Sequence, residues 1–384
     1  MRISIAVHGR FHAFDLAAAL LRHGEDVHLL TNYPASVVAR WFPAERTISY
    51  RTHGLLSRAA RALARGEPPP LLEASLKRMF GRWVAGQHAH NPPALVHCWS
   101  GVAEETLRAC GTQTICTVAR GSAHIKTQFD LLAEEELRVG RRLEKPSAWI
   151  RAREQREYGL AHRVIVPSTF ARDSFLQQGQ PAERVAVVNL SLRARGFVAD
   201  EAAIEQRLRR LRSNEPLRVL YVGMLSYRKG MHDLQNVMRR LGKRMQFRLV
   251  GAVLPECRDF ARTAADYAQV DGAVAESALP AVYAWGDVFV LPTIEDGFAV
   301  VLAQAQAAGL PILTTTNCGG PDILEGGGEG WVVPIRNADA IVERLEWCAQ
   351  HRAEVAFMVE RLHRQPPQRN WDDVAADLLQ AVTA

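Results

Sequence analysis

Short β-branched segments alternate with helical segments along almost the whole chain, and this alternation restricts the fold more than any other feature. Residues 3–7 read as a strand, residues 13–22 as a helix and residues 26–31 as a second strand. Further strands are expected at 94–99, 112–118, 163–167, 185–188, 217–223, 246–252, 268–274, 287–291 and 311–315. Such alternation builds βαβ units around a parallel sheet that is covered on both faces. The predicted fold class is α/β.

The chain is long enough for two domains. Its 384 residues exceed the size at which one core usually stops growing. The alternation loosens after Val188, a polar connector rich in Arg and Glu follows, and a new series of strands begins at Leu217. We therefore expect an N-terminal domain over residues 1–195 and a C-terminal domain over residues 196–367.

Composition narrows the class of protein. A hydrophobic fraction of 48% and a charged fraction of 23% are ordinary for a soluble globular enzyme. There is no apolar run long enough for a transmembrane helix, and the N-terminus enters a strand without a signal-peptide core. Six scattered cysteines without a CxxC pair favour reduced thiols in the cytoplasm and disfavour structural zinc. The net charge of +6 comes without a nucleic-acid motif, so an anionic lipid or a phosphorylated substrate explains it equally well.

A basic loop follows the first strand of the second domain. That strand ends at Gly223, and Arg228-Lys229-Gly230 precedes a helix that begins near Met231. Backbone N–H groups and the helix dipole favour an anion there, and the Arg and Lys side chains neutralise it. This loop is suited to a diphosphate.

The stretch from Leu291 to Gly309 is the second candidate site. A buried strand ends at Leu291, a loop carries Glu295 and Asp296, and Gly297 opens a small, apolar helix that ends at Gly309. A buried helix whose N-terminus meets such a loop suits a phosphorylated ligand. Gln304 within that helix needs a polar partner. The alternative is a buried strand–loop–helix corner with a capping acid.

This stretch resembles the donor-sugar motif of the family-4 retaining glycosyltransferases, in which two Glu residues are separated by seven others. Aligned on Gly297 and Phe298, Asp296 takes the first place and Gln304 the second. The resemblance implies the GT-B fold, with two Rossmann-like domains facing a central cleft and the last helix, 368–384, packing back on the first domain. It implies transfer of a sugar from a nucleotide-diphosphate sugar to an acceptor hydroxyl with retained configuration, in polysaccharide, lipopolysaccharide or other glycoconjugate synthesis.

The loop at Arg228 is also similar to this family, whose usual Arg is replaced here by Met224. The resemblance implies catalytic roles for Lys229, Arg228, Asp296 and His124. It implies donor binding by Gly223, Gly251, Val274, Glu295, Gly297, Phe298, Ala299 and Gln304. No metal and no cofactor beyond the nucleotide-sugar co-substrate are expected.

The acceptor is expected on the N-terminal side. The loop after the first strand reads His8-Gly9-Arg10, which is not GxGxxG and disfavours a nicotinamide or flavin. Residues 120–124 resemble an Arg-Gly-Ser-x-His segment found in a subgroup of the family. The expected acceptor-side residues are Gly9, Arg10, His12, Arg120 and Ser122. For His124 a structural role is the alternative.

Residues 51–91 contain two basic helical stretches separated by Pro68-Pro69-Pro70. They suit an anionic bilayer surface or a lipid-linked acceptor, and equally a solvated basic face on packed helices. A cytoplasmic protein, with peripheral membrane contact left open, is the expectation.

Two other classes of function stay open. One is another GT-B enzyme, such as a sugar-nucleotide epimerase or a phosphorylase. The other is a catalytically silent nucleotide-sugar-binding scaffold. Met224 and Gln304 favour it, because they replace the family's usual Arg and Glu. The donor base, the sugar, the acceptor, the linkage and the oligomeric state are not determined at this level.

Overall fold

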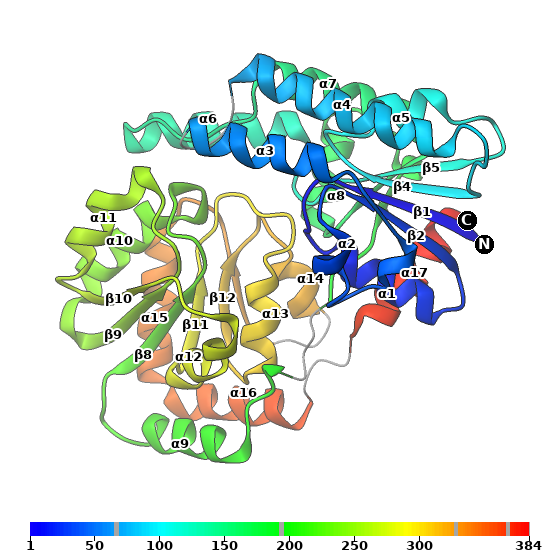
Figure 1. Ribbon diagram of the computed structural model, residues 1–384. Coiled ribbons are helices and arrows are strands. Elements are labelled where there is room, and N and C mark those ends of the chain that lie inside the picture. The colour runs from blue at the N-terminus through cyan, green and yellow to red at the C-terminus, as the bar shows by residue number, and fades with distance from the viewer. Residues whose placement is uncertain (65–68, 192–195, 326–328, 366–368, 384) are drawn as a thin grey trace.

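Two α/β domains, each built around one parallel sheet, face each other in the computed structural model (Figure 1). The structure describes residues 1–64, 69–191, 196–325, 329–365 and 369–383. The first sheet has seven strands in the order β3-β2-β1-β4-β5-β6-β7, and the second has six in the order β10-β9-β8-β11-β12-β13. Both orders reverse direction beside the first strand of the domain. Ligands of doubly wound sheets bind at such a reversal, beyond the carboxyl ends of the strands.

The strands of the first sheet are β1 (Arg2–Val7), β2 (Asp26–Thr31), β3 (Thr47–Ser49), β4 (Leu95–Trp99), β5 (Ile115–Ala119), β6 (Arg163–Val166) and β7 (Val185–Val187). Those of the second are β8 (Leu217–Val222), β9 (Met245–Val250), β10 (Ala268–Gly272), β11 (Val288–Leu291), β12 (Ile312–Thr315) and β13 (Gly330–Val333). The predicted α/β class and the two parallel sheets are confirmed. The edge strands β3 and β13 were not predicted.

The helices of the N-terminal part are α1 (Ala13–Arg22), α2 (Ala35–Val38), α3 (Arg51–Ala64), α4 (Pro70–His88), α5 (Glu104–Ala109), α6 (Ile125–Val139), α7 (Ala148–Leu160) and α8 (Thr169–Gln177). The later ones are α9 (Glu201–Leu211), α10 (Met231–Leu241), α11 (Arg258–Ala264), α12 (Leu279–Trp285), α13 (Val300–Ala307), α14 (Gly320–Glu325), α15 (Ala338–Gln350), α16 (Arg352–Arg364) and α17 (Trp371–Thr383). Among these described helices, none combines the length and the apolar character that crossing a bilayer requires.

The C-terminal helix α17 packs beside α1 on the first domain (Figure 1). Its buried residues Val374, Ala375, Leu378 and Val382 form one stripe, as residues three or four apart do on a helix. This stripe joins the core cluster that contains Ile3, Ile5 and Val7 of β1. The chain therefore ends on the domain where it began.

The helix α9 belongs to the second domain. Its Arg207 is fully buried and donates to the backbone carbonyls of Tyr283, Gly286, Ala308 and Gly309. A buried guanidinium needs several acceptors, and these loop ends supply them. The expected domain junction, between residues 195 and 196, falls at the end of residues 192–195, which lie outside the described part of the chain. Residue 68 of the expected proline break and residues 366–368 at the expected end of the second domain also lie outside it.

Candidate functional site

A cavity of about 950 Å³ lies between the two domains. Its N-terminal wall comes from the loops after β1, β4 and β5 and from α3 and α4. Its C-terminal wall comes from the loops after β8 and β11 and from the start of α13. These loops flank the reversal of strand order in each sheet, which is where a doubly wound fold binds its ligands.

The loop after β8 is shaped by two glycines. A Cβ on Gly251 would overlap the carbonyl oxygen of Gly223, so only glycine lets these two loops lie in contact. Gly223 lines the cavity, whereas Gly251 supports it from behind. The Gly251 amide donates to Gly272 at 2.7 Å, which ties in the end of β10 as well. Val274 follows β10 and is partly exposed outside the cavity lining.

Lys229 and Asp296 form an ion pair inside the cavity. Lys229 ends a short 3₁₀ turn, Tyr227–Lys229, and Gly230 follows it in the left-handed conformation at φ 79°. A side chain on Gly230 would overlap the carbonyl oxygen of Pro292, just after β11. The close approach at Gly230 places the basic turn against the acidic loop. The basic loop at 228–230 and the acidic loop at 295–296, which were predicted as two separate sites, therefore lie in contact.

Glu295 is fully buried and joins the two domains. It accepts hydrogen bonds from the hydroxyl of Ser122, the amide of Ala123 at 3.1 Å and the amide Nε2 of Gln128 at 3.0 Å, all from the N-terminal domain. Arg228 contacts the same carboxylate at 2.8 Å. Burial raises the pKa of Glu295, but the charge of Arg228 and these hydrogen bonds outweigh it and lower the pKa to about 2. The carboxylate is therefore charged, and it is a link between the domains rather than part of the cavity lining.

The domains also touch at Gly297. A Cβ there would overlap the backbone carbonyl of Gly121, and the Ser168 hydroxyl donates to the Gly297 carbonyl at 2.5 Å. Asp322 accepts from the amide of Thr169 at 3.1 Å in the same interface. Gly297 therefore allows the domains to come together beside the site, and it does not itself line the cavity.

Phe298 and Ala299 line the cavity just before α13. Ala299 has a φ of 61° and precedes a helix that begins at Val300, three residues later than the Gly297 start that the sequence predicted. The glycine does not open the helix because its backbone is used for the contact with Gly121. No side chain caps this helix among the described residues, so its first amides are available to an anion.

Gln304 has a polar partner, as its place in α13 required. Tyr283 of α12 donates its hydroxyl to Gln304 Oε1 at 2.7 Å. Gln304 lies one turn beyond Val300, on the same face of the helix. Val300 lines the cavity, whereas Gln304 is half-buried behind it.

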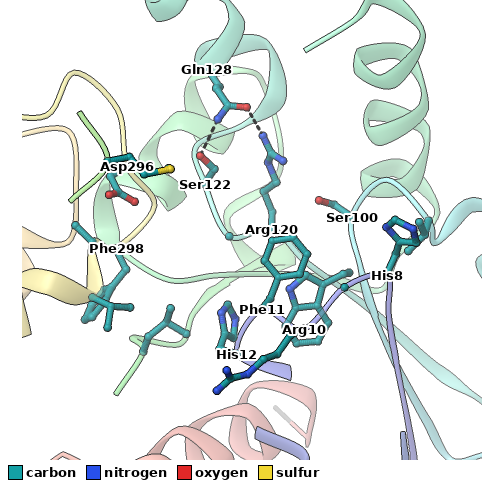
Figure 2. Close-up of a pocket in the computed structure, with 18 of the residues that line it drawn as sticks. His8, Arg10, Phe11, His12, Ser100, Arg120, Ser122, Gln128, Asp296 and Phe298 are labelled. Carbon is teal, nitrogen blue, oxygen red and sulfur yellow. Dashed lines mark hydrogen bonds between the residues drawn. The ribbon is translucent and has the colours of Figure 1, made fainter. Parts of the chain in front are cut away.

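All five expected acceptor-side residues line the opposite wall: Gly9, Arg10, His12, Arg120 and Ser122 (Figure 2). The Arg10 guanidinium stacks over Trp41 at 4.1 Å. His12 packs against Trp99 and Trp371, and burial lowers its pKa to about 4, so the imidazole is neutral. Trp371 comes from α17, so the C-terminal helix contributes to the surroundings of His12.

Arg120 is held by its neighbours. It donates to Gln128 Oε1 at 2.7 Å and to the Ala123 carbonyl at 3.1 Å, and it pairs with Glu154 at 3.2 Å. Figure 2 shows Gln128 bridging Ser122 and Arg120. The positive charge of Arg120 is therefore largely compensated by the carboxylate of Glu154.

His124 does not reach the cavity, and the expectation that it faces the cleft is corrected. Its ring packs against Phe175 and Tyr158, with centroids 4.9 and 5.2 Å away. It caps α6 by accepting from the Lys126 amide, and burial together with the Arg120 charge lowers its pKa to about 4. The structural alternative therefore describes this residue.

Several cavity residues were not among the expected site residues, although Arg58, Arg61 and Lys77 belong to the basic stretch 51–91 that suits a lipid-linked acceptor. His8, Phe11, Arg58, Arg61 and Lys77 all line the cavity. Phe11 has a φ of 41° and exposes 64% of its surface, an unusual state for an aromatic residue. For α3, the sequence did carry a signal that these residues share one side of a helix, because positions 54, 57, 58 and 61 follow helical spacing.

Comparison with known proteins finds a family model that matches the second domain. Residues 216–351 match the model of the family described as Glycosyl transferases group 1. A putative colanic acid biosynthesis glycosyltransferase of Salmonella typhimurium is 30% identical over 145 residues, which is 34% of this chain and 35% of the relative. A GDP-mannose-dependent α-(1-6)-phosphatidylinositol monomannoside mannosyltransferase of Mycobacterium tuberculosis is 26% identical over 230 residues, covering 56% of this chain and 60% of the relative. The aligned stretches thus span less than two thirds of these relatives.

Solved structures share the whole architecture. Sucrose-phosphate synthase from Thermosynechococcus elongatus superposes with a TM-score of 0.72 at 19% identity over 99% of this chain and 98% of the other. Anabaena HepE in complex with UDP gives 0.68 at 13% identity over the full length of both chains. Likenesses at this identity establish the fold, and the expected GT-B arrangement of two facing Rossmann-like domains is confirmed.

Proposed function

We propose that this protein is a glycosyltransferase that moves a sugar from a nucleotide-diphosphate sugar to an acceptor hydroxyl, in the synthesis of a polysaccharide, lipopolysaccharide or other glycoconjugate. One observation carries the proposal. The Arg228-Lys229 turn, Asp296 and the uncapped start of α13 converge on one cavity within the segment that matches the glycosyltransferase family model. One relative is a putative glycosyltransferase of colanic acid biosynthesis and another is a phosphatidylinositol monomannoside mannosyltransferase, which supports the glycoconjugate class.

Charge is the difficulty that such a reaction must overcome. The leaving diphosphate becomes more negative as the bond to the sugar breaks. We assign its stabilisation to Lys229 and Arg228, with the amides before α13, and a well-placed donor of this kind contributes roughly 3–4 kcal/mol. A diphosphate at Lys229 competes with Asp296 for the ammonium, which leaves the Asp296 carboxylate able to accept a hydrogen bond from a sugar hydroxyl. The proposal includes no metal ion.

We further propose the retaining chemistry of family 4. Among the described residues of the lining, the carboxylates are Glu154 and Asp296, and each is already paired with a cation. Because Glu154 is held by Arg120 and Asp296 is assigned to a sugar hydroxyl, neither carboxylate is left as the nucleophile of a double displacement, and attack on the same face, assisted by the leaving phosphate, is the more consistent route. Proton NMR of the product measures the configuration of the new bond, and an inverted anomer would contradict this part of the proposal.

The acceptor is assigned to the N-terminal wall. Phe11 offers an exposed aromatic face for a sugar ring, and Gly9, Arg10, His12 and Ser122 surround it. On the donor side, we propose that the Gln304 amide donates to a ribose hydroxyl while Tyr283 holds its Oε1.

Peripheral contact with an anionic membrane is part of the proposal. Leu55, Leu63 and Leu71, on α3 and α4, expose 61%, 87% and 86% of their surface. Basic side chains with exposed leucines suit a bilayer interface. Six free thiols fit a reducing cytoplasmic location. Co-sedimentation with phosphatidylglycerol vesicles, and its absence with phosphatidylcholine vesicles, tests the contact.

A two-stage experiment tests the function. Thermal shift with UDP-, GDP-, dTDP- and ADP-sugars identifies the donor, and release of the nucleoside diphosphate is then followed with candidate glycan acceptors. Transfer to an acceptor supports the proposal. An epimerised nucleotide sugar or a sugar phosphate as the product would instead identify another GT-B enzyme, and binding without any turnover would identify a scaffold.

A further inference from the structure

The cavity is lined by more positive charge than a nucleotide diphosphate requires. Among the described residues, its cationic side chains are Arg10, Arg58, Arg61, Lys77, Arg120, Arg228 and Lys229. Its carboxylates are Glu154 and Asp296. An excess of one sign in a cleft attracts the opposite charge, because low-dielectric walls concentrate the field.

The cations divide into groups by their surroundings. Arg228 and Lys229 stand on the C-terminal wall, which we call the donor wall because the donor is assigned to it. They contact Glu295 and Asp296. Arg120 is paired with Glu154. Arg10 stacks over Trp41. Arg58, Arg61 and Lys77 line the cavity from α3 and α4, and we call them the α3–α4 cation wall.

One face of α3 is turned toward the cavity. Gly54, Ser57, Arg58 and Arg61 occupy one face of the helix at spacings of three and four, and all of them line the cavity. Gly54 fixes the approach, because a Cβ there would overlap the carbonyl oxygen of Asn32 after β2. The face is therefore held close to the carboxyl end of the sheet.

Lys77 joins the same wall from α4. Its ammonium is 3.8 Å from Glu73, at the long end of an ion pair. His8 lies beneath the wall, edge-on to His53 and 3.4 Å from the Ser57 hydroxyl. Burial and the charges of Lys77, His53 and Arg61 lower the pKa of His8 to about 3, so the imidazole is neutral and available as an acceptor or a donor.

We infer that the α3–α4 cation wall binds an anionic group, a phosphate or a carboxylate, carried by the sugar acceptor. The inference rests on the proposed glycosyltransferase function and deepens it by naming the acceptor class. Guanidinium and ammonium groups that line one space favour an anion within it, and charge-assisted hydrogen bonds to phosphate or carboxylate are the strongest available to them. Phe11 lines the same cavity, and we assign it the contact with the sugar ring of the acceptor.

Two sources of the anion are distinguished by two pairs of probes. Methyl β-D-glucuronide against methyl β-D-glucoside represents an acidic sugar, and dihexanoyl phosphatidic acid against dihexanoyl phosphatidylcholine represents a phosphorylated lipid. NMR titration of the full chain measures the four dissociation constants. In at least one pair we expect the wild type to bind the anionic member at least ten-fold more tightly.

Variants test whether the α3–α4 cation wall is responsible for the preference for the anionic probe. R58Q/R61Q/K77Q is expected to lose the preference, and R209Q/R262Q/R364Q, which removes the same charge from exposed positions of the C-terminal domain, is expected to keep it. If the first triple variant does not fold, R58Q alone is expected to reduce the preference about three-fold, because Arg58 is an exposed residue of α3. No preference in either pair, or a preference that survives in R58Q/R61Q/K77Q, overturns the inference.

A parallel thermal shift of the wild type with UDP and GDP separates the two proposals. Stabilisation by a nucleotide without any preference for the anionic probes overturns the acceptor assignment alone. A preference for the anionic probes in a protein that binds none of the nucleoside diphosphates or their sugars overturns the glycosyltransferase proposal, and with it the description of this anion as part of an acceptor.

Discussion

The guanidinium of Arg228 and the carboxylate of Glu295 lie 2.8 Å apart, and Glu295 also accepts hydrogen bonds from Ser122 and Ala123 of the other domain. One buried carboxylate thus orients a cation of the donor wall and holds the two domains together. The position of Arg228 therefore depends on the contact between the domains.

Removing either member of the Lys229–Asp296 pair is expected to abolish transfer. K229A loses a cation at the leaving diphosphate, and D296A loses the acceptor for a sugar hydroxyl. Losses of about 10²–10³ in kcat are typical when one such group is removed. The melting temperature should stay near that of the wild type, because both side chains face the cavity. K126A, which breaks the exposed pair with Asp130, is the matched control. Wild-type rates in K229A and D296A would refute the site assignment.

Glu295→Gln is expected to destabilise the protein. The substitution leaves Arg228 without its anion and places an amide donor opposite the Gln128 donor. Breaking a buried, hydrogen-bonded ion pair from one side costs about 3–5 kcal/mol. Urea denaturation measures the loss, with E205Q on the exposed face of α9 as the control. A difference below about 1 kcal/mol between E295Q and wild type would show that the network contributes little.

The contribution of Glu295 should depend on pH in a defined window. Its folded pKa is about 2, below the ordinary value of 4.5, so the folded state binds fewer protons than the unfolded state between these values. The stabilisation is therefore complete above pH 4.5 and is lost as the pH falls toward 2. The difference in unfolding free energy between wild type and E295Q, followed from pH 7 to pH 3, should shrink below pH 4.5. A difference that grows on acidification would contradict the pKa direction.

Gly297→Ala is expected to disturb the contact between the domains, because the added methyl group would overlap the backbone carbonyl of Gly121. Backbone atoms on both sides cannot move aside as a flexible side chain does. Overpacking of this kind usually costs about 1–3 kcal/mol. Small-angle scattering should show a larger radius of gyration, and transfer should fall. G121A is the matched control, since a Cβ at Gly121 meets nothing within 4 Å. Equal behaviour of both variants would contradict the packing argument.

Gln304 and Tyr283 separate a binding role from a structural one. Q304A removes both the bond to Tyr283 and the proposed donor to ribose, whereas Y283F removes only the bond. We expect both variants to lose about 1 kcal/mol of stability. Q304A should also raise the KM for the nucleotide sugar roughly ten-fold, which corresponds to about 1.4 kcal/mol. Equal KM values in the two variants would leave Gln304 with only a structural role.

Local patterns predicted the framework well. The eleven strands expected from periodicity between residues 3–7 and 311–315 all appear, with ends shifted by a few residues. The loops after β8 and β11 were found from glycine, basic and acidic residues that stand next to each other in the sequence. The start of α13 was misplaced because Gly297 is used for a contact with Gly121, about 170 residues away.

The sequence by itself determined the α/β class, the two series of strands and the loops that carry Lys229 and Asp296, because these depend on periodicity and on neighbouring residues. Only the tertiary structure decided which polar groups meet across the chain. It buried Glu295 among Ser122, Ala123 and Gln128, turned His124 onto Phe175 and Tyr158, and brought Arg58 and Lys77 to the cavity wall. The physical reason is that burial, ion pairing and domain contact are set by packing between distant segments, for which local sequence carries no signal.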